Sequence, residues 1–295
     1  VGIETPDAQA LALTGKTQNL REDILASVMR IQAHGLEVTG GFIVGFDGES
    51  DDIFERQRRF IQSAGVPTAM VGLLMALPNT RLARRLAAEG RLLEECQGNN
   101  THHLRLNFVP QMPAERLLEG YKQLLADIYS PRAYFRRCRT LLERLPRRPR
   151  VPGSPRPGDT AAFFRSLWWQ GFSRYGLRYL GLLLWALLTR PARFPAAVTL
   201  AVRGHHYFRI THEILEAHAF TTVVRDLIQE LQARAARPMP HGGQALEAYL
   251  RGVLRPVRKA YERLSAEARV LVGDTYVELE RRCRGALKSL SASSA

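Results

Sequence analysis

The chain has 295 residues, of which 45% are hydrophobic and 24% are charged. These proportions are close to those of ordinary globular proteins and exclude a mainly disordered or collagen-like chain. The three cysteines, Cys96, Cys138 and Cys283, are too few and too widely spaced for a disulfide scaffold or a cysteine metal motif. We therefore expect a reduced, cytoplasmic protein.

The net charge of +14 is unevenly distributed along the chain. Residues 1–130 contain 13 Lys and Arg against 16 Asp and Glu, whereas residues 131–295 contain 29 against 12. The positive excess therefore lies in the second half, which suits an anionic partner surface. Its arginines are spread over several predicted helices and no nucleic-acid-binding motif is present, so we expect no nucleic-acid partner.

Residues 1–90 alternate between predicted strands and helices. Apolar and β-branched runs predict strands over 1–4, 36–46 and 69–75, and helical spacing predicts helices over 23–33, 51–64 and 80–90. Strands separated by helices indicate a parallel sheet. Because three strands are few for a complete sheet or barrel, and the first lies at Val1, we expect that further strands precede this residue.

From about residue 111 the pattern becomes helical. Amphipathic helices are predicted over 113–130, 221–238 and 242–288. Residues 133–145, which are rich in arginine, and the apolar and aromatic region 159–218 are also expected to be helical. Residues 146–158 contain five prolines and four arginines and predict an extended linker. The expected organisation is an α/β portion over 1–110, a helical extension over 111–145, the linker over 146–158 and a basic, all-α domain over 159–295.

The most hydrophobic run of the chain covers residues 179–188. It has ten residues, whereas a helix that spans a membrane needs about 20. The run is flanked by four arginines, Arg174, Arg178, Arg190 and Arg193. Trp168 and Trp169 lie shortly before it, and Trp185 lies within it. We expect a buried helix, with a basic helix lying at a membrane surface as the alternative.

Polar and turn residues follow each predicted strand. Glu4 ends the first strand, the second continues into a loop that ends at Glu49, and the third ends in Leu74, Met75 and Ala76. Because the carboxyl ends of parallel strands meet at one edge of a sheet, where α/β folds bind ligands, we expect these residues to lie close together.

These residue types suit a nucleoside. A carboxylate at Glu4 can accept hydrogen bonds from vicinal hydroxyls, and Ile43 can pack on a flat aromatic ring. Gly41 and Gly45 allow the backbone to approach a ligand closely. The backbone after Leu74 can pair with the edge of a base. The alternatives are that Glu4 is a surface carboxylate and Ile43 an ordinary core residue.

Together, the segments GIET (2–5), GGFIVGFDGE (40–49), MVGLLMALP (70–78), NFVPQM (107–112) and IYSPRAYF (128–135) resemble the second half of a radical S-adenosylmethionine (SAM) barrel. The resemblance extends over the first 145 residues and is greatest to a subfamily that has a cobalamin-binding domain and a helical C-terminal domain of unknown function. The expected fold class is therefore α/β, the second half of a partial barrel with three parallel strands, followed by an all-α region.

The resemblance also implies a role for each residue at the strand ends. Glu4 would hold the SAM ribose, and Ile43, with Gly41 and Gly45 beside it, would lie against the adenine. Glu49 would close this motif through hydrogen bonds within its own loop. The backbone of Leu74, Met75 and Ala76 would meet the edge of the adenine. The resemblance assigns no catalytic side chain and no metal ligand to this chain.

The resembled family holds a 4Fe–4S cluster on a C-x-x-x-C-x-x-C loop and uses the cluster to cleave SAM. This chain has no such motif. We expect that the loop lies upstream of Val1 and that this chain alone is inactive. The alternative is a non-catalytic remnant, a basic helical module that binds a membrane surface or a partner.

The resemblance implies that the intact enzyme uses SAM, the 4Fe–4S cluster, a reductant protein and cobalamin. Its reaction would be a cobalamin-dependent methylation, or a related radical reaction, of a small-molecule or lipid-like substrate. The expected location is cytoplasmic, with peripheral attachment to the inner membrane as a variant.

Two further polar segments carry side chains of the kinds that bind ligands. Residues 99–103 (NNTHH) are expected to form a loop at the mouth of the barrel. His212 and Glu216 are four residues apart and can share a helix face, for which a surface or core role is expected rather than metal binding.

Overall fold

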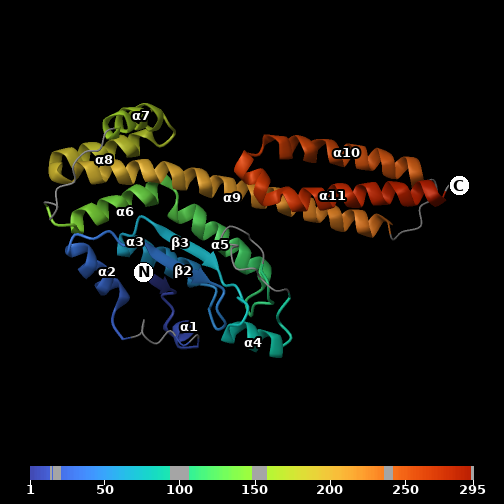
Figure 1. Cartoon of the computed structure of the whole chain (residues 1–295), viewed down its shortest axis with the longest axis horizontal. Helices are drawn as coiled ribbons and strands as arrows, with labels where there is room; N and C mark the ends of the chain where they lie inside the picture. Colours follow the sequence, from blue (N-terminus) through green and yellow to red (C-terminus); the bar gives the residue numbers. More distant parts are fainter. Residues whose placement is uncertain (14, 16–20, 94–105, 148–157, 236–241, 294–295) are drawn as a thin grey trace. The chain divides into compact units, whose positions relative to one another are not determined.

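The structure is a computed structural model, which describes residues 1–13, 15, 21–93, 106–147, 158–235 and 242–293 (Figure 1). The chain divides into two compact units, Val1–Thr211 and His212–Ala295. The predicted linker at 146–158 lies almost wholly outside the described residues, and the domain boundaries expected near residues 110, 145 and 158 stay predictions.

The first unit contains a parallel sheet with the strand order β1-β2-β3, formed by β1 (Gly2–Glu4), β2 (Gly40–Val44) and β3 (Ala69–Leu73). Its helices are α1 (Ala8–Leu13), α2 (Ile24–Ala33), α3 (Ile53–Ala64), α4 (Arg81–Ala88), α5 (Ala114–Ile128), α6 (Pro131–Arg144), α7 (Asp159–Gly171), α8 (Gly176–Thr189), the 3₁₀ turn η2 (Pro191–Arg193) and the start of α9 (Phe194–Ala235). An α/β portion followed by an all-α region confirms the predicted fold class.

The two faces of the sheet have different surroundings. One face is buried and consists of Ile3, Phe42, Val44, Ala69 and Val71. Phe60 of α3 packs edge-on against Phe42, with ring centroids 6.0 Å apart, so α3 covers this face. Side chains alternate along a strand, so the opposite face carries Gly41, Ile43, Met70 and Gly72. Met70 is 61% exposed, and this second face is the open one.

The outer edge of β3 is covered by two tyrosines of α5 and the residue after it. The hydroxyl of Tyr121 donates to the Val71 carbonyl at 3.0 Å. The hydroxyl of Tyr129 donates to the Ala69 carbonyl at 2.7 Å and accepts from the Ala69 N–H at 3.2 Å. Phenol groups thus take the place of a further strand along this edge, which explains how β3 ends the sheet.

Several arginines in the second half hold helix ends in place. Arg144 of α6 donates to the Ser63 and Ala64 carbonyls at 2.7 Å, at the C-terminus of α3. Arg190 donates to three carbonyls at the C-terminus of α6, those of Leu142, Glu143 and Leu145. The last carbonyls of a helix lack intrahelical partners, so part of the positive excess serves the fold rather than a ligand.

In the first unit, α6 lies between the sheet layer and α8, and α7 lies on the outer side of α8 (Figure 1). The hydroxyl of Tyr134 donates to the Leu200 carbonyl at 2.8 Å, which fixes the start of α9 on α6. An added Cβ at Gly204 would lie 2.5 Å from the Tyr134 ring, so the two helices pack closely because residue 204 has no side chain.

The second unit consists of the end of α9, α10 (Gly242–Arg263) and α11 (Ala266–Ser293). Its core is a set of buried residues from the three helices, among them Phe220, Val224, Val272 and Leu279. Tyr261 and Tyr276 stack face to face with ring centroids 4.2 Å apart.

Three local expectations were wrong. The predicted break between helices near residue 220 does not exist, because α9 continues to Ala235. The helix α1 was not predicted. The run 179–188 was expected to be buried, but in α8 only one of its faces is, and Leu184, Leu187 and Leu188 are more than half exposed.

Candidate functional site

The centre of the open sheet face is Ile43. It lies directly opposite Gly72 of β3 in the strand register, and Gly41 lies opposite Met70. An added Cβ at Gly72 would meet no heavy atom of the described residues within 4 Å, and one at Gly41 would meet only the Val1 carbonyl oxygen at 3.8 Å. The two glycines therefore leave space on both sides of Ile43.

Glu4 ends β1 in an unusual backbone conformation. Its φ is 67°, in the left-handed region that residues other than glycine rarely adopt. A Cβ on Gly2 would lie 2.9 Å from Glu4 Oε1, so the carboxylate lies over Gly2, on the open face. Gly2 is paired with Gly41 in the register. Glu4 and Ile43 thus lie on the same face of neighbouring strands.

Gln57 of α3 holds the ends of β1 and β2 together. Its amide donates to the Glu4 carbonyl at 3.1 Å and to the Ile43 carbonyl at 3.0 Å, and its side chain is fully buried. This contact supports the left-handed conformation of Glu4. Strained backbone that the surroundings maintain is frequent at functional sites, so Glu4 is a candidate site residue on geometric grounds also.

Glu49 is bound by the loop that follows β2. Its Oε2 accepts from the Gly45 N–H at 2.8 Å and the Phe46 N–H at 3.2 Å, and its Oε1 accepts from the Thr5 hydroxyl at 3.1 Å. Burial raises the pKa of Glu49 to about 7, although these hydrogen bonds lower it. The φ of Gly45 is 102°, which requires glycine, and an added Cβ would lie 3.0 Å from Leu117.

The chain after β3 is held by Asn107. Its side-chain Nδ2 donates to the Ala76 carbonyl at 2.9 Å, and its Oδ1 accepts from the Ala76 N–H at 3.0 Å. The Leu74 N–H donates to the Val44 carbonyl at 2.8 Å and so continues the sheet. Leu74 and Ala76 are buried and Met75 is partly exposed. Both backbone polar groups of Ala76 are thus already bonded to the protein.

A cluster of three charged residues lies at the same edge of the sheet. Arg91 binds both carboxylate oxygens of Asp47, at 2.7 Å from Nη2 and 3.1 Å from Nη1, and Arg85 of α4 lies 2.5 Å from the same carboxylate. The Asp47 carboxylate raises the pKa of Arg91. The carboxylate of Asp47 is thus bound by these two arginines.

The structure brings most of the predicted site residues to one place. Glu4, Gly41 and Ile43 share the open face, whereas Gly45 and Glu49 shape the loop beside it, and Leu74, Met75 and Ala76 continue β3. Their roles toward a cofactor stay predictions.

Sequence reasoning missed three residues that position this edge, Gln57, Asn107 and Arg91. A weak signal existed for Gln57, which is the polar member of an otherwise apolar stripe on α3 with Ile53, Ile61 and Ala64.

No group of three or more His, Cys, Asp and Glu that would suit a metal ion is found within the described residues. Cys138 and Cys283 are buried and far apart in sequence, and Cys96 lies outside the described residues, as does the polar segment 99–103. His212 Nδ1 lies 3.7 Å from Glu216 Oε1 on the exposed surface of α9, as the four-residue spacing predicted.

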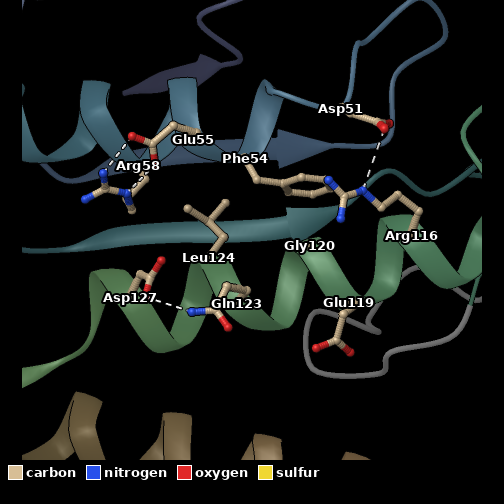
Figure 2. A pocket seen from close by; sticks show the side chains of 10 residues that line it. All are labelled: Asp51, Phe54, Glu55, Arg58, Arg116, Glu119, Gly120, Gln123, Leu124 and Asp127. Atoms are coloured by element: carbon tan, nitrogen blue, oxygen red, sulfur yellow. Dashed lines mark hydrogen bonds and ion pairs between the residues drawn. The ribbon is translucent and has the colours of Figure 1, made fainter.

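A groove of about 290 Å³ lies between α3 and α5 (Figure 2). The charged side chains that line it are engaged in ion pairs and hydrogen bonds. Glu55 binds Arg58 at 2.6 Å, Gln123 binds Asp127 at 2.9 Å, and Arg116 approaches Asp51 at 3.8 Å. Phe54 points toward Gly120, where a Cβ would clash at 2.2 Å. The groove marks the helix crossing, and the strand-end residues described above do not line it.

Comparison with known proteins places the chain among methyltransferase relatives. A family model described as "Domain of unknown function (DUF4070)" matches residues 80–219. The chain is 34% identical over 212 residues to a Synechocystis protein named "uncharacterized methyltransferase sll1242", covering 71% of this chain and 40% of the relative. No solved structure matches.

Two relatives carry more specific names. Over 137 residues, the chain is 34% identical to the hopanoid C-2 methylase of Rhodopseudomonas palustris, covering 46% of this chain and 25% of the relative. Over 138 residues, it is 25% identical to the bacteriochlorophyllide d C-12(1)-methyltransferase of Chlorobaculum tepidum, covering 46% and 30%. The chain thus spans less than half the length of each of these relatives.

Proposed function

We propose that this chain is the SAM-binding part of a radical SAM methyltransferase, in which Ile43 forms the platform for the adenine of SAM. The observation that carries the proposal is the partly exposed Ile43 with open space above Gly41 and Gly72 on either side. The names of the relatives support methyl transfer as the reaction.

The residues on the open face fit the adenosine half of SAM. A flat ring needs an apolar surface, and Ile43 offers one, because two glycines flank it and it also packs against the buried cluster that includes Phe46 and Leu74. A ribose needs an acceptor for its hydroxyls, and the Glu4 carboxylate lies on the same face. The fit does not require pairing of the adenine with Ala76, whose backbone groups bind Asn107. The backbone of Leu74 or Met75 is the better candidate for the base edge.

In this proposal, the chain's own residues bind and orient. Ile43 and its glycines fix the plane of the adenine, and Glu4 fixes the ribose through its hydroxyls. Gln57 and Asn107 hold the ends of the three strands in fixed positions. The residues that would contact the adenine and the ribose therefore keep one fixed arrangement. When bound, SAM supplies the reactive group.

The described residues do not fit a 4Fe–4S cluster, because thiolates are its usual ligands and the two described cysteines are both buried, one in each unit. Burial also raises the pKa of the Cys138 thiol to about 12, which disfavours the thiolate. We propose that the cluster ligands, a cobalamin-binding part and the contact with a reductant protein lie in a portion of the enzyme that this chain does not contain. A cytoplasmic location and a small or lipid-like substrate belong to the same proposal.

Saturation-transfer NMR with S-adenosylhomocysteine tests the adenosine site. We expect transfer to the adenine protons in the wild-type chain and its loss in Gly72→Val, which places a side chain beside Ile43 at a position where an added Cβ meets no described atom within 4 Å. Glu4→Gln should weaken transfer to the ribose protons. Met29→Asp, on α2 behind the sheet, is the matched control and should bind as wild type. Transfer that is absent, or unchanged in Gly72→Val, contradicts the proposal.

The cluster part of the proposal has its own test, the genomic DNA that precedes the codon for Val1. An in-frame C-x-x-x-C-x-x-C motif is expected there. A stop codon directly before Val1 would overturn this part and leave the remnant hypothesis.

A further inference from the structure

The outer helices of the first unit expose an unusual number of large apolar side chains. On α7, on α8 and in the turn between them, the exposed fractions are 65% for Trp168, 71% for Trp169, 80% for Phe172, 89% for Leu177 and 73% for Leu188. Scattered exposed apolar residues are normal, but this many large ones on two neighbouring helices indicate an interaction surface.

Helix α8 has two apolar faces, and the fold buries only one. Tyr179, Leu182, Leu183 and Ala186 are buried. A second set, spaced by three or four residues, is exposed and consists of Leu177, Leu180, Leu184, Leu187 and Leu188. A hydrogen bond of 2.8 Å between the Ser166 and Tyr179 hydroxyls fixes α7 on α8. The exposed side chains therefore stand on a fixed support; we refer to them, with Phe164, Trp168, Trp169 and Phe172, as the α7–α8 face.

The charge of the segment that carries this face is strongly positive. Residues 159–212, from the start of α7 onward, contain seven arginines against one acidic residue, Asp159. Some of these arginines serve the fold: Arg190 binds carbonyls at the end of α6, and Arg203 pairs with Glu37. By contrast, Arg165, Arg174 and Arg178 are exposed and make no ion pair with any described residue. Each of them lies within two residues of a member of the α7–α8 face in the sequence.

We propose that the α7–α8 face binds the surface of an anionic lipid bilayer, with its tryptophans, Phe172 and leucines in the interfacial region and the three free arginines at the lipid phosphates. Trp and Phe on one face and basic residues beside them are the features of helices that lie in a membrane interface. Basic side chains near an anionic bilayer are attracted by its negative surface potential.

Charge decides between lipid and protein as the partner. A protein partner would have to match an apolar centre with several acidic groups, whereas an anionic bilayer provides apolar depth and dense negative charge together. None of the described helices is long and apolar enough to cross a membrane, so the proposal concerns binding at the surface. It depends on neither SAM nor the cluster.

The tryptophans provide a selective probe, because all three in the chain, Trp168, Trp169 and Trp185, lie in α7 and α8. The experiment mixes the full chain with vesicles of phosphatidylcholine alone or with phosphatidylglycerol added. We expect sedimentation with the mixed vesicles, a blue shift of the tryptophan fluorescence and quenching by brominated lipid. Added salt should weaken the binding, since it screens the arginines.

Two variants separate the contributions. The triple variant Trp169→Ser, Phe172→Ser, Leu188→Ser should lower vesicle affinity about tenfold or more, because it removes three apolar side chains that the bilayer would bury. The variant Arg165→Gln, Arg174→Gln, Arg178→Gln should lose the preference for phosphatidylglycerol. The matched control is Val270→Ser, which changes an apolar residue of α11 that is 82% exposed, and it should bind as wild type. Circular dichroism checks that each variant keeps its helices.

Three outcomes would overturn the proposal. They are no binding to either vesicle, binding that the triple serine variant leaves unchanged, and self-association without lipid binding that the same variant abolishes. The last outcome would make the α7–α8 face an interface between copies of the chain.

Discussion

Asn107 and Ala76 pair through two hydrogen bonds, as two residues of neighbouring strands would. The side-chain amide of Asn107 supplies both a donor and an acceptor, at 2.9 and 3.0 Å, and both residues are almost fully buried. Asn107 lies in the segment that follows α4. An antiparallel β-bridge between Leu92 and Phe108, the residue after Asn107, fixes its position. The end of β3 is therefore fixed by a residue 31 positions further along the chain.

Asn107→Ala should destabilise the chain strongly. It leaves a buried N–H and a buried carbonyl of Ala76 without partners, and each such group costs about 1–3 kcal/mol. We expect a loss of about 2–4 kcal/mol in the free energy of unfolding, measured by urea denaturation. The control is Gln123→Ala, which removes an exposed amide of α5 and should cost under about 0.5 kcal/mol. Equal effects of the two changes would contradict the role given to Asn107.

Glu49 should make stability depend on pH. Its pKa is about 7 in the folded chain and takes its ordinary value of 4.5 in the unfolded chain. Between these values the folded state keeps a proton that the unfolded state has released. The contribution of Glu49 to stability is therefore greatest below pH 4.5, falls as the pH rises through 7 and is then constant, with a total change of roughly 3 kcal/mol.

Urea denaturation of the wild type and Glu49→Gln at several pH values between about 5 and 8 measures this contribution. The difference between the two proteins isolates Glu49 from other titrating groups. We expect the glutamine variant to lose the decline, and Glu115→Gln, a change of an exposed carboxyl on α5, to keep it. A decline that persists in Glu49→Gln would show that another group causes it.

The parts of the fold that depend on local signals could be predicted from the sequence. Asp23 and Thr80 begin α2 and α4 as N-caps, each accepting from a backbone N–H of the first turn, and Gly65 ends α3 in the left-handed conformation. The candidate site residues were found in the same way, because polar residues after parallel strands meet at one edge.

What could not be predicted depends on contacts distant in sequence. The continuity of α9 through Phe220 and the two threonines after it is one example, because packing of Phe220 in the second unit outweighs the low helix propensity of threonine. The exposure of α8 is another, because leucines on two faces do not reveal which face the fold buries. Gln57 and Asn107 act on strand ends that only the folded chain brings to them.

The contact of Asp47 with Arg91 should contribute more to stability than an exposed ion pair. The Asp47 and Arg91 side chains are only 10% and 18% exposed. Asp47→Asn leaves the charge of Arg91 largely buried with a weaker set of partners, and we expect a loss of about 3 kcal/mol in the free energy of unfolding. The control is Arg59→Gln, which removes a pair with Glu55 in which Arg59 is 72% exposed and should cost under about 1 kcal/mol. A loss of the same size in both variants would contradict this ranking.

Tyr129→Phe should both destabilise the chain and promote its aggregation. The hydroxyl of Tyr129 binds the N–H and the carbonyl of Ala69 on the outer edge of β3, and burial raises its pKa to about 12, so it stays a donor at any ordinary pH. Without it, two buried backbone groups lack a partner, at a cost of about 1–3 kcal/mol. The same groups are then unpaired at the edge of the sheet, where local opening exposes them to another strand.

Urea denaturation and light scattering on incubation measure the two effects. Adding Tyr121→Phe, which removes the bond to the Val71 carbonyl, should increase both. The control is Tyr261→Phe, which keeps the ring stacked on Tyr276 in the second unit and should leave stability and scattering unchanged. If Tyr129→Phe lowered stability without raising aggregation, the tyrosine would serve the packing of α5 alone, and some other feature would keep the edge of β3 from pairing.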